Sequence, residues 1–256
     1  MVHLQALPGT PKNHLSVSEI EKDACLEARK LASNGMDGVI VENMHDVPYV
    51  NNCGPETVAS VARICSRIKR ELRDYNILYG VQILASCNRE ALAVALATDF
   101  DFIRAEGFVF SHVADEGWTD ACAGELLRYR KLIGAEHISI LTDIKKKHSS
   151  HNVTADVNLI ETAKAAEFFL TDGVIVTGTA TGDPPNPADV RDAKNNLKTP
   201  VIVGSGVDIN NLKEYFAADA LIVGSSLKQN GHWVESISET RVKEFVQNAN
   251  SISDTN

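Results

Sequence analysis

Short apolar runs alternate with longer segments of helical periodicity along the whole chain. Eight of the runs are rich in β-branched residues and predict strands, which begin near residues 2, 39, 78, 102, 138, 173, 201 and 220. The segments between them repeat apolar residues every three or four positions, as amphipathic helices do. The strands are apolar on both faces, which is typical of parallel strands that helices cover. The pattern therefore predicts an alternating β/α fold.

Signals of helix starts support this alternation. Ser18 and Glu21 form a capping-box pattern ahead of the first helix, and Asn88 is placed to cap the third. Proline occupies the expected first turn of two further helices, at Pro55 and at Pro187. Two longer loops are expected, at residues 107–124 and 145–152.

Length and topology together predict the fold class. We expect a single (β/α)8 TIM barrel over residues 1–250, followed by a flexible polar tail at 251–256. One barrel of roughly 250 residues fits the length, and no linker or change of composition divides the chain. A doubly wound parallel sheet is the alternative.

Charge and cysteine content limit the classes of binding partner and the cellular compartments that fit the sequence. The 34 acidic and 25 basic residues give a formal net charge of -9, which argues against nucleic acid or an acidic membrane as partner. No apolar run approaches the length of a membrane span. The five cysteines contain no C-x-x-C pair, which indicates a reducing compartment. We therefore expect an intracellular, cytoplasmic protein, or a mitochondrial one if a longer N-terminal form exists.

Cys53 and Cys87 follow the second and third predicted strands. Their thiols are expected either to be packed and inert or to be reactive.

The last two predicted strands both break into glycine and serine. The breaks are Gly204-Ser205-Gly206 and Gly224-Ser225-Ser226. In (β/α)8 barrels the loops after these strands commonly hold a phosphate, because glycine lets backbone N–H groups approach an anion. We expect both loops to bind phosphate with help from Lys228, although plain strand-ending turns are the alternative.

Polar side chains gather at the carboxyl ends of the predicted strands, where barrel enzymes carry their chemistry. Burying unpaired charge is costly, so these groups either form a layer of salt bridges or hold a polar ligand. For the second case we expect catalytic roles for Asp143, Lys145, Glu42, Arg104 and Glu106. The expected substrate-binding residues are His3, Asn43, Gln82, Thr177 and Thr179.

Asp143 and Lys145 are the strongest catalytic candidates. Two residues apart on a strand, they face the same way and are predicted to form a proton-transfer pair. A structural ion pair is the alternative, as is a Schiff-base lysine at Lys145 or a solvated basic loop over Lys145–Lys147. We expect no cofactor, because the histidines and carboxylates lack the tight spacing of metal ligands. The weak metal candidates are His3, Glu42, Asp143 and His148.

An ordered set of motifs resembles the BtpA family over nearly the whole chain. The motifs are His3-Leu-Gln-Ala-Leu-Pro-Gly-Thr-Pro11, Asp37-Gly-Val-Ile-Val-Glu-Asn43, Gly80-Val-Gln-Ile-Leu84, Phe102-Ile-Arg-Ala-Glu106, Asp172-Gly-Val-Ile-Val-Thr-Gly-Thr-Ala-Thr-Gly182 and Gly224-Ser-Ser-Leu-Lys-Gln-Asn-Gly231. The resemblance implies a barrel of the ribulose-phosphate-binding type. The family is named after photosystem I biogenesis, which implies no mechanism, and Gln82 stands where the family tends to have Asn.

Two classes of function remain open at this point. The first is an enzyme of the lyase or isomerase type that binds a small phosphorylated metabolite such as a sugar phosphate. The second is a non-catalytic barrel that acts as a protein assembly or stability factor. We expect no nucleic acid and no membrane insertion, and assembly into a homo-oligomer through the helices is a further expectation.

Overall fold

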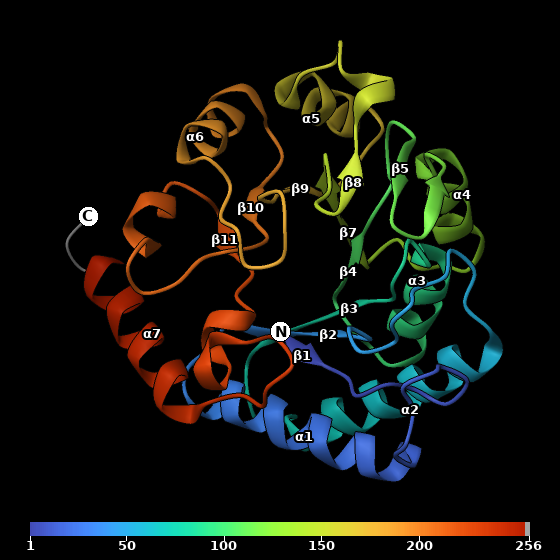
Figure 1. Ribbon diagram of the computed structural model, residues 1–256, viewed down its shortest axis with the longest axis vertical. Coiled ribbons are helices and arrows are strands. Elements are labelled where there is room, and N and C mark those ends of the chain that lie inside the picture. The colour runs from blue at the N-terminus through green and yellow to red at the C-terminus, as the bar shows by residue number, and fades with distance from the viewer. Residues whose placement is uncertain (254–256) are drawn as a thin grey trace. The chain divides into compact units, whose positions relative to one another are not determined.

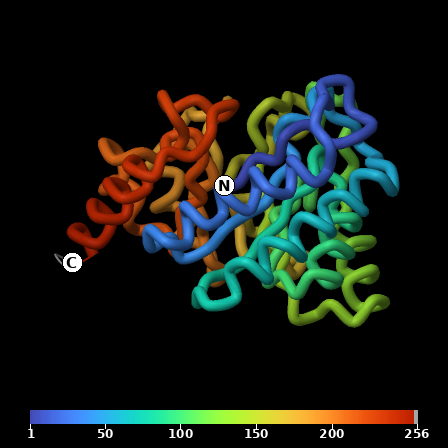
Figure 2. The backbone as a smooth tube through the Cα atoms, turned by 90° about the horizontal axis from the view of Figure 1, so that it is seen from below, coloured from blue at the N-terminus to red at the C-terminus, as the bar shows by residue number. Residues whose placement is uncertain are grey.

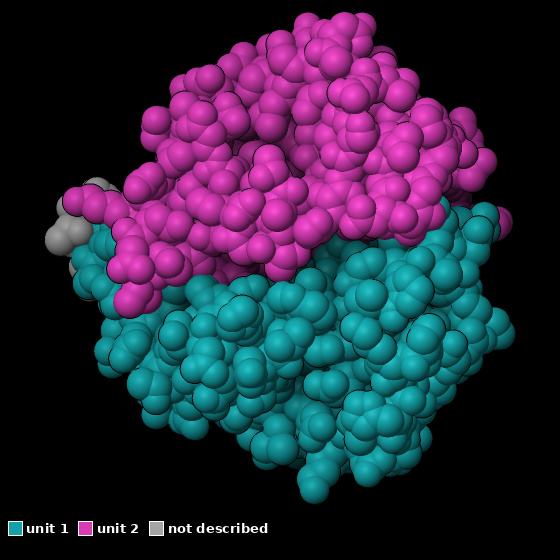
Figure 3. Space-filling model, in the orientation of Figure 1, with its two compact units in different colours: residues 1–103, 225–256 teal, residues 104–224 magenta. Residues whose placement is uncertain are grey.

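The computed structural model describes residues 1–253, and the chain divides into two compact units (Figure 3). The first unit contains residues 1–103 and the C-terminal segment from Ser225, and the second runs from Arg104 to Gly224. The division falls inside strand β4 (Phe102–Ala105). In the parallel sheet, neighbouring strands follow one another in sequence order: β1-β2-β3-β4-β7-β9-β10-β11.

The first unit alternates strands and helices (Figure 1). Its elements are β1 (Val2–His3), α1 (Val17–Ser33), β2 (Gly38–Glu42), α2 (Pro55–Glu71), β3 (Leu78–Gln82), α3 (Asn88–Ala97), the start of β4, the 3-10 turns η3 (Ser225–Leu227) and η4 (Gln229–Gly231), and α7 (Glu239–Ser253). Helix α1 packs against both α2 and α7, and Figure 2 shows α1 and α2 side by side. The parallel register pairs His3 with Glu42 and Glu42 with Gln82, so three polar residues share one level of this sheet.

The second unit continues the same alternation and adds a small separate sheet. Its elements are the end of β4, β5 (His112–Ala114), β6 (Gly117–Thr119), α4 (Ala123–Leu132), β7 (Ser139–Ile144), β8 (Ser149–Ser150), the 3-10 turn η1 (Asn152–Thr154), α5 (Leu159–Phe168), β9 (Gly173–Val176), α6 (Pro187–Asn196), β10 (Val201–Val203), the 3-10 turn η2 (Leu212–Tyr215) and β11 (Ala220–Leu221). Strands β6, β5 and β8 form the small antiparallel sheet, in that order. Both predicted long loops therefore contain strands that the sequence pattern did not reveal.

The capping box of α1 lies two residues earlier than predicted. Ser16, with an extended backbone, accepts the N–H of Glu19, and Glu19 Oε2 accepts the N–H of Ser16 at 2.8 Å. Two S-x-x-E patterns overlap here, and only the one that starts at Ser16 satisfies both donors. At Pro187 the prediction is confirmed, since α6 begins there, and the side chain of the preceding Asn186 accepts the N–H of Ala188.

The end of α7 also differs from the expected tail. The helix continues to Ser253, so residues 251–253 are helical, and residues 254–256 lie outside the described residues. After β10 the chain forms only the four-residue turn η2 in place of a full helix.

Candidate active site

An arginine and an aspartate at the carboxyl ends of β4 and β7 form a buried ion pair. Arg104 Nε lies 3.2 Å from both carboxylate oxygens of Asp143, and Nη2 lies 3.0 Å from both. The two residues are 4% and 7% exposed. A guanidinium held in this way presents a rigid planar cation, because two of its donors are fixed on one carboxylate.

A second buried ionic group lies in the same unit, and we call it the Lys146 cluster: Lys146, Glu106 and Glu116. The ammonium of Lys146 lies 2.9 Å from Glu116 Oε1 and 3.4 Å from Glu106 Oε2. Burial alone would lower the pKa of Lys146, but the charges of both carboxylates outweigh burial and raise the pKa. Lys146 is therefore a permanent buried cation at neutral pH. The sequence had suggested a solvated basic loop here.

The predicted pairing of Asp143 with Lys145 is wrong. Strand β7 ends at Ile144, and Lys145 has a left-handed backbone with φ of +46°, so the strand alternation stops before it. Its ammonium donates to the carbonyl of Thr154 at 3.3 Å, while Asp143 is held by Arg104.

Strand β5 and the residue after β8 add two histidines beside these groups. The rings of His112 and His151 lie 5.3 Å apart. Burial lowers the pKa of His112, as does the nearby charge of Lys146, although the Phe110 carbonyl opposes them. Within residues 1–253, the buried Nε2 of His112 has no hydrogen-bond partner. A buried imidazole that is neutral and has an unused nitrogen is a candidate general base.

These side chains meet at a small cavity. It has a volume of about 10 Å³, which is about the space that one water molecule needs. The titratable residues that line it are Asp143, Lys145, Lys146, His112 and His151. Acidic, basic and neutral titratable groups therefore surround one point in the second unit.

The first Gly-Ser break leaves two backbone donors unused. Gly204 donates its N–H to the Val176 carbonyl at 2.9 Å, so this N–H is not free for an anion as predicted. The hydroxyl of Ser205 accepts the N–H of Gly178 and donates to the carbonyl of Asp183. The backbone N–H groups of Ser205 and Gly206 have no acceptor within the described part of the chain. Gly206 has a left-handed backbone with φ of +68°, and successive N–H groups beside such a residue are the arrangement that binds anions in other proteins.

Gly204 also brings this loop close to the Arg104 guanidinium. A Cβ atom at Gly204 would lie 2.4 Å from Ile175 Cγ2 and 3.1 Å from Arg104 Nη2. Because Ile175 belongs to the neighbouring strand and cannot withdraw, alanine at this position must displace the backbone.

We expect Gly204→Ala to lower the free energy of unfolding by about 1–3 kcal/mol, because overpacking forces backbone shifts of this cost. Urea unfolding measures the change. Gly124→Ala is the matched control, since a Cβ there meets only the mobile end of Arg128, at 3.2 Å. Equal losses in both variants would contradict the close packing of Gly204.

The threonines after β9 behave differently from each other. Thr177 Oγ1 is buried and has no hydrogen-bond partner among residues 1–253, which is consistent with a binding role. The exposed Thr179 donates to Asp183 Oδ2 at 3.2 Å. His148, a weak metal candidate, interacts with Thr181 Oγ1 at 2.8 Å and is exposed.

In the first unit, His3 and Glu42 form a buried pair. The distance from His3 Nε2 to Glu42 Oε2 is 3.5 Å, and His3 Nδ1 lies 3.1 Å from the Trp233 carbonyl. Burial and the charge of Lys228 lower the pKa of His3 well below its usual value. Gln82 is 3% exposed, and its Oε1 finds no partner in the described residues. Of the predicted binding residues in this unit, Gln82 has the clearest signature of a ligand contact.

Asn43 has a structural role in place of the predicted binding role. Its Oδ1 accepts the N–H of Leu84 at 2.7 Å, and its Nδ2 donates to Asp46 Oδ2 at 2.8 Å. The amide therefore ties together the loops that follow β2 and β3, with both of its polar atoms engaged.

Lys228 does not have the free ammonium that phosphate binding requires. Its Nζ pairs with Glu27 Oε2 on α1 at 2.7 Å, and the residue is 1% exposed. Burial lowers the pKa of Lys228, although Glu27 partly offsets this effect. Glu27 also accepts the N–H of Ile237, so the pair ties the C-terminal segment to α1. Ser225 and Ser226 lie in η3, and the predicted convergence of Gly224–Ser226 on an anion stays a prediction.

Known structures confirm the predicted fold class. The fold is similar to a thiamine phosphate pyrophosphorylase from Pyrococcus furiosus, with a TM-score of 0.60, 14% identity, and 89% and 90% of the two chains covered. It is also similar to a phosphoribosyl anthranilate isomerase from Thermus thermophilus, with a TM-score of 0.57, 13% identity, and 89% and 94% covered. The protein thus has the fold of a (β/α)8 barrel.

Sequence relatives define the family more narrowly. The BtpA family model matches residues 1–251. The chain is 50% identical to an uncharacterised mitochondrial protein of Caenorhabditis elegans, covering 98% of this chain and 92% of that one. It is 34% identical to the photosystem I biogenesis protein BtpA of Synechocystis, covering 96% and 85%. The chain belongs to the BtpA family.

In residues 1–253, no helix has both the length and the apolarity to cross a membrane.

Proposed function

We propose that this protein is an enzyme of the lyase or isomerase type that acts on a small phosphorylated metabolite. The observation that carries the proposal is the pair of unused N–H groups at Ser205 and Gly206, next to a glycine that lies against the Arg104 guanidinium. A phosphate would accept from both N–H groups, with the unpartnered hydroxyl of Thr177 as a third donor. Arg104 would add positive charge.

Acid and base groups in the second unit suit proton transfer next to a carbonyl group. In this proposal His112 Nε2 takes a proton from carbon, and the Lys146 ammonium stabilises the oxyanion that forms. Return of the proton to the neighbouring carbon, with transfer of the hydroxyl proton from one oxygen of the enediolate to the other, would complete the isomerisation of a hydroxy carbonyl compound. Asp143 and Lys145 would line the reacting atoms, with Arg104 holding Asp143 in place, and Glu106 would orient the Lys146 ammonium.

The cavity between these groups accommodates a water molecule and no more, so a sugar phosphate needs additional room. The hairpin of β5 and β6, which carries His112 in β5 and Glu116 in its turn, would have to move to admit it. Displacement of such covering segments is a common step in enzymes that exclude water from the reaction.

Backbone amide resonances test the anion site directly. We expect titration of isotopically labelled protein with inorganic phosphate to shift the amide signals of Ser205 and Gly206. The Gly204 amide is an internal control, because its N–H is bonded to Val176. The proposal fails if Ser205 and Gly206 do not respond, or if all three amides shift equally.

A panel of phosphorylated metabolites, each with its unphosphorylated counterpart, tests which class of compound the protein binds. A ligand at a hundred times its dissociation constant stabilises the fold by about 2.7 kcal/mol, so thermal unfolding should detect the substrate. Stabilisation by the phosphorylated member alone supports the proposed class.

An assembly factor is the second candidate function. Phe168, Phe169 and Leu170 are consecutive exposed apolar residues at the end of α5, with 81%, 47% and 68% of their surface accessible. Such a patch favours contact with another protein. The Synechocystis relative is named for photosystem I biogenesis. Loss of cellular function on Phe168→Ser, with phosphate binding intact, would favour this candidate.

We also propose a mitochondrial location. The support is the 50% identity to a relative whose name describes it as mitochondrial. Fractionation of cells that express the natural full-length form provides the test, and recovery in the cytosolic fraction alone would contradict it.

A further inference from the structure

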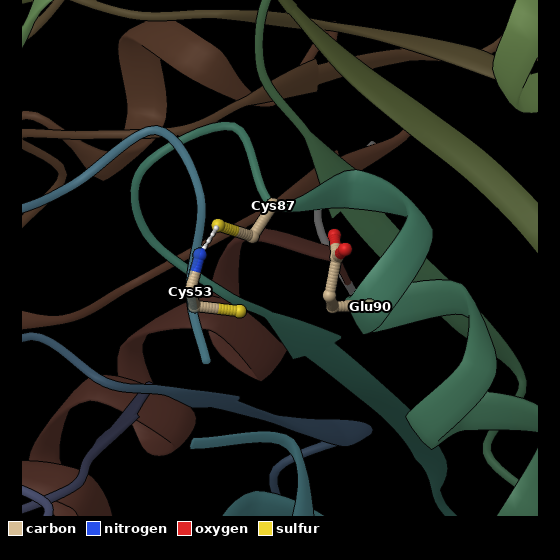
Figure 4. Close-up of side chains that lie close together, drawn as sticks. All are labelled: Cys53, Cys87 and Glu90. Atoms are coloured by element: carbon tan, nitrogen blue, oxygen red, sulfur yellow. Dashed lines mark hydrogen bonds between the residues drawn. The ribbon is translucent and has the colours of Figure 1, made fainter. Parts of the chain in front are cut away.

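The fold brings together two cysteines that are far apart in sequence. Cys53 precedes α2, Cys87 is the residue before α3, and Glu90 lies in the first turn of α3. The two sulfur atoms and a carboxylate oxygen all lie within 4.8 Å of one another (Figure 4). Cys87 and Glu90 are three positions apart, so they share one face of the helix start, and Cys53 approaches from another loop.

The spacing of these three atoms is close to that of a zinc site. A tetrahedral ion with bonds of about 2.0–2.3 Å places its ligand atoms roughly 3.5–3.8 Å apart. The observed limit of 4.8 Å leaves at most about 1.3 Å to close, which side-chain rotation can supply. The ligand atoms also favour zinc, because thiolates bind zinc in preference to magnesium or calcium.

Local hydrogen bonding and charge also favour a cation here. The N–H of Cys53 donates to Cys87 Sγ at 3.3 Å, the kind of contact that stabilises a metal-bound thiolate. The Glu90 carboxylate lies beside the two sulfur atoms, and a divalent ion would neutralise its negative charge.

We propose that Cys53, Cys87 and Glu90 bind a zinc ion through two sulfur atoms and one oxygen atom. Binding converts both thiols to thiolates and releases two protons to solvent. Three protein ligands leave a fourth position for water or another small ligand, as in catalytic zinc sites. Cys87 is 2% exposed, whereas Cys53 and Glu90 are partly exposed, so this position is expected on their side. The proposal is independent of the phosphate site.

Cobalt provides a spectroscopic test that needs no substrate. Full-length protein is purified with reductant, stripped with a chelator and titrated with Co²⁺ alone. We expect one equivalent to bind, with a thiolate-to-cobalt charge-transfer band in the near ultraviolet, and zinc to displace it. Cys53→Ser and Cys87→Ser should each abolish the band. Glu90→Gln should weaken binding by at least about tenfold, because even outer partners of a metal site contribute this much.

Cys122→Ser is the matched control, because Cys122 is also a partly exposed cysteine and lies in the other unit. It should leave the band unchanged, and circular dichroism of the metal-free variants confirms that each one folds. No charge-transfer band in the folded wild type would overturn the proposal, as would a band that survives Cys53→Ser. Formation of a Cys53–Cys87 disulfide in air, with no cobalt binding after reduction, would also overturn it.

Discussion

Replacing Lys146 with methionine is expected to lower the free energy of unfolding by about 3–5 kcal/mol, the cost of removing one partner from a buried ionic group. The variant leaves Glu106 and Glu116 buried without the ammonium that lies 3.4 and 2.9 Å from them. Methionine keeps most of the volume of the lysine stem, so lost packing contributes little. Equilibrium unfolding in urea, with the slope checked for two-state behaviour, measures the loss.

Lys145→Met is the matched control for this prediction. The Lys145 ammonium makes one hydrogen bond, to the Thr154 carbonyl, so its loss should cost about 0.5–1.5 kcal/mol. The raised pKa of Lys146 means that its stabilisation is complete below the ordinary lysine value near 10.4 and is lost only as pH rises through the higher folded value. Titration of Lys146 should therefore add no pH dependence between pH 7 and 9. Equal losses in the two variants would show that the Lys146 cluster contributes no special stability.

Local signals in the sequence predicted the alternation of elements well. The apolar pattern from Gly38 to Glu42 matches β2, and proline after asparagine marks the start of α6. Such signals depend only on residues that are close in sequence, so they can be identified without knowledge of the fold. The capping box was misplaced because Ser16 and Ser18 offer the same pattern, and only the folded backbone distinguishes them.

The ionic groups of the second unit were harder to predict because they depend on two non-local features. The left-handed backbone of Lys145 ends the alternation of β7, so the adjacent Lys146 is buried in its place. His112 reaches the cavity and Glu116 reaches Lys146 through the antiparallel hairpin of β5 and β6, and these short strands carry too few residues for a clear pattern. Arg104 and Asp143 were both selected correctly as polar strand ends, but their pairing depends on the order of strands in the sheet.

The cysteines illustrate the same limit. Cys53 and Cys87 are 34 residues apart, without the close spacing that identifies metal ligands in a sequence. They meet because β2 and β3 are neighbouring parallel strands whose carboxyl ends share one edge of the sheet. A sequence search for short ligand motifs misses sites of this kind.

His112→Gln is expected to lower turnover by about 10²- to 10⁴-fold, the usual contribution of a positioned proton-transfer group. The reason is geometric, since Nε2 is the unpartnered nitrogen of a buried imidazole at the cavity, next to the Lys146 ammonium. Glutamine preserves much of the shape but cannot accept a proton from carbon. The assay is the incorporation of deuterium from D2O into whichever phosphorylated compound most stabilises the wild type. His137→Gln, an exposed histidine of the same unit, should leave the rate unchanged.

The pH dependence separates a base from a merely structural histidine. Because burial and the charge of Lys146 lower the pKa of His112, the imidazole stays neutral at pH values where an ordinary histidine, near 6.5, is protonated. The wild-type kcat/KM should therefore hold steady as pH falls from 8 to about 6.5 and decline only below that value. His112→Gln should lose this acidic limb together with the rate. If the variant keeps both the limb and most of the rate, another group removes the proton and His112 serves packing alone.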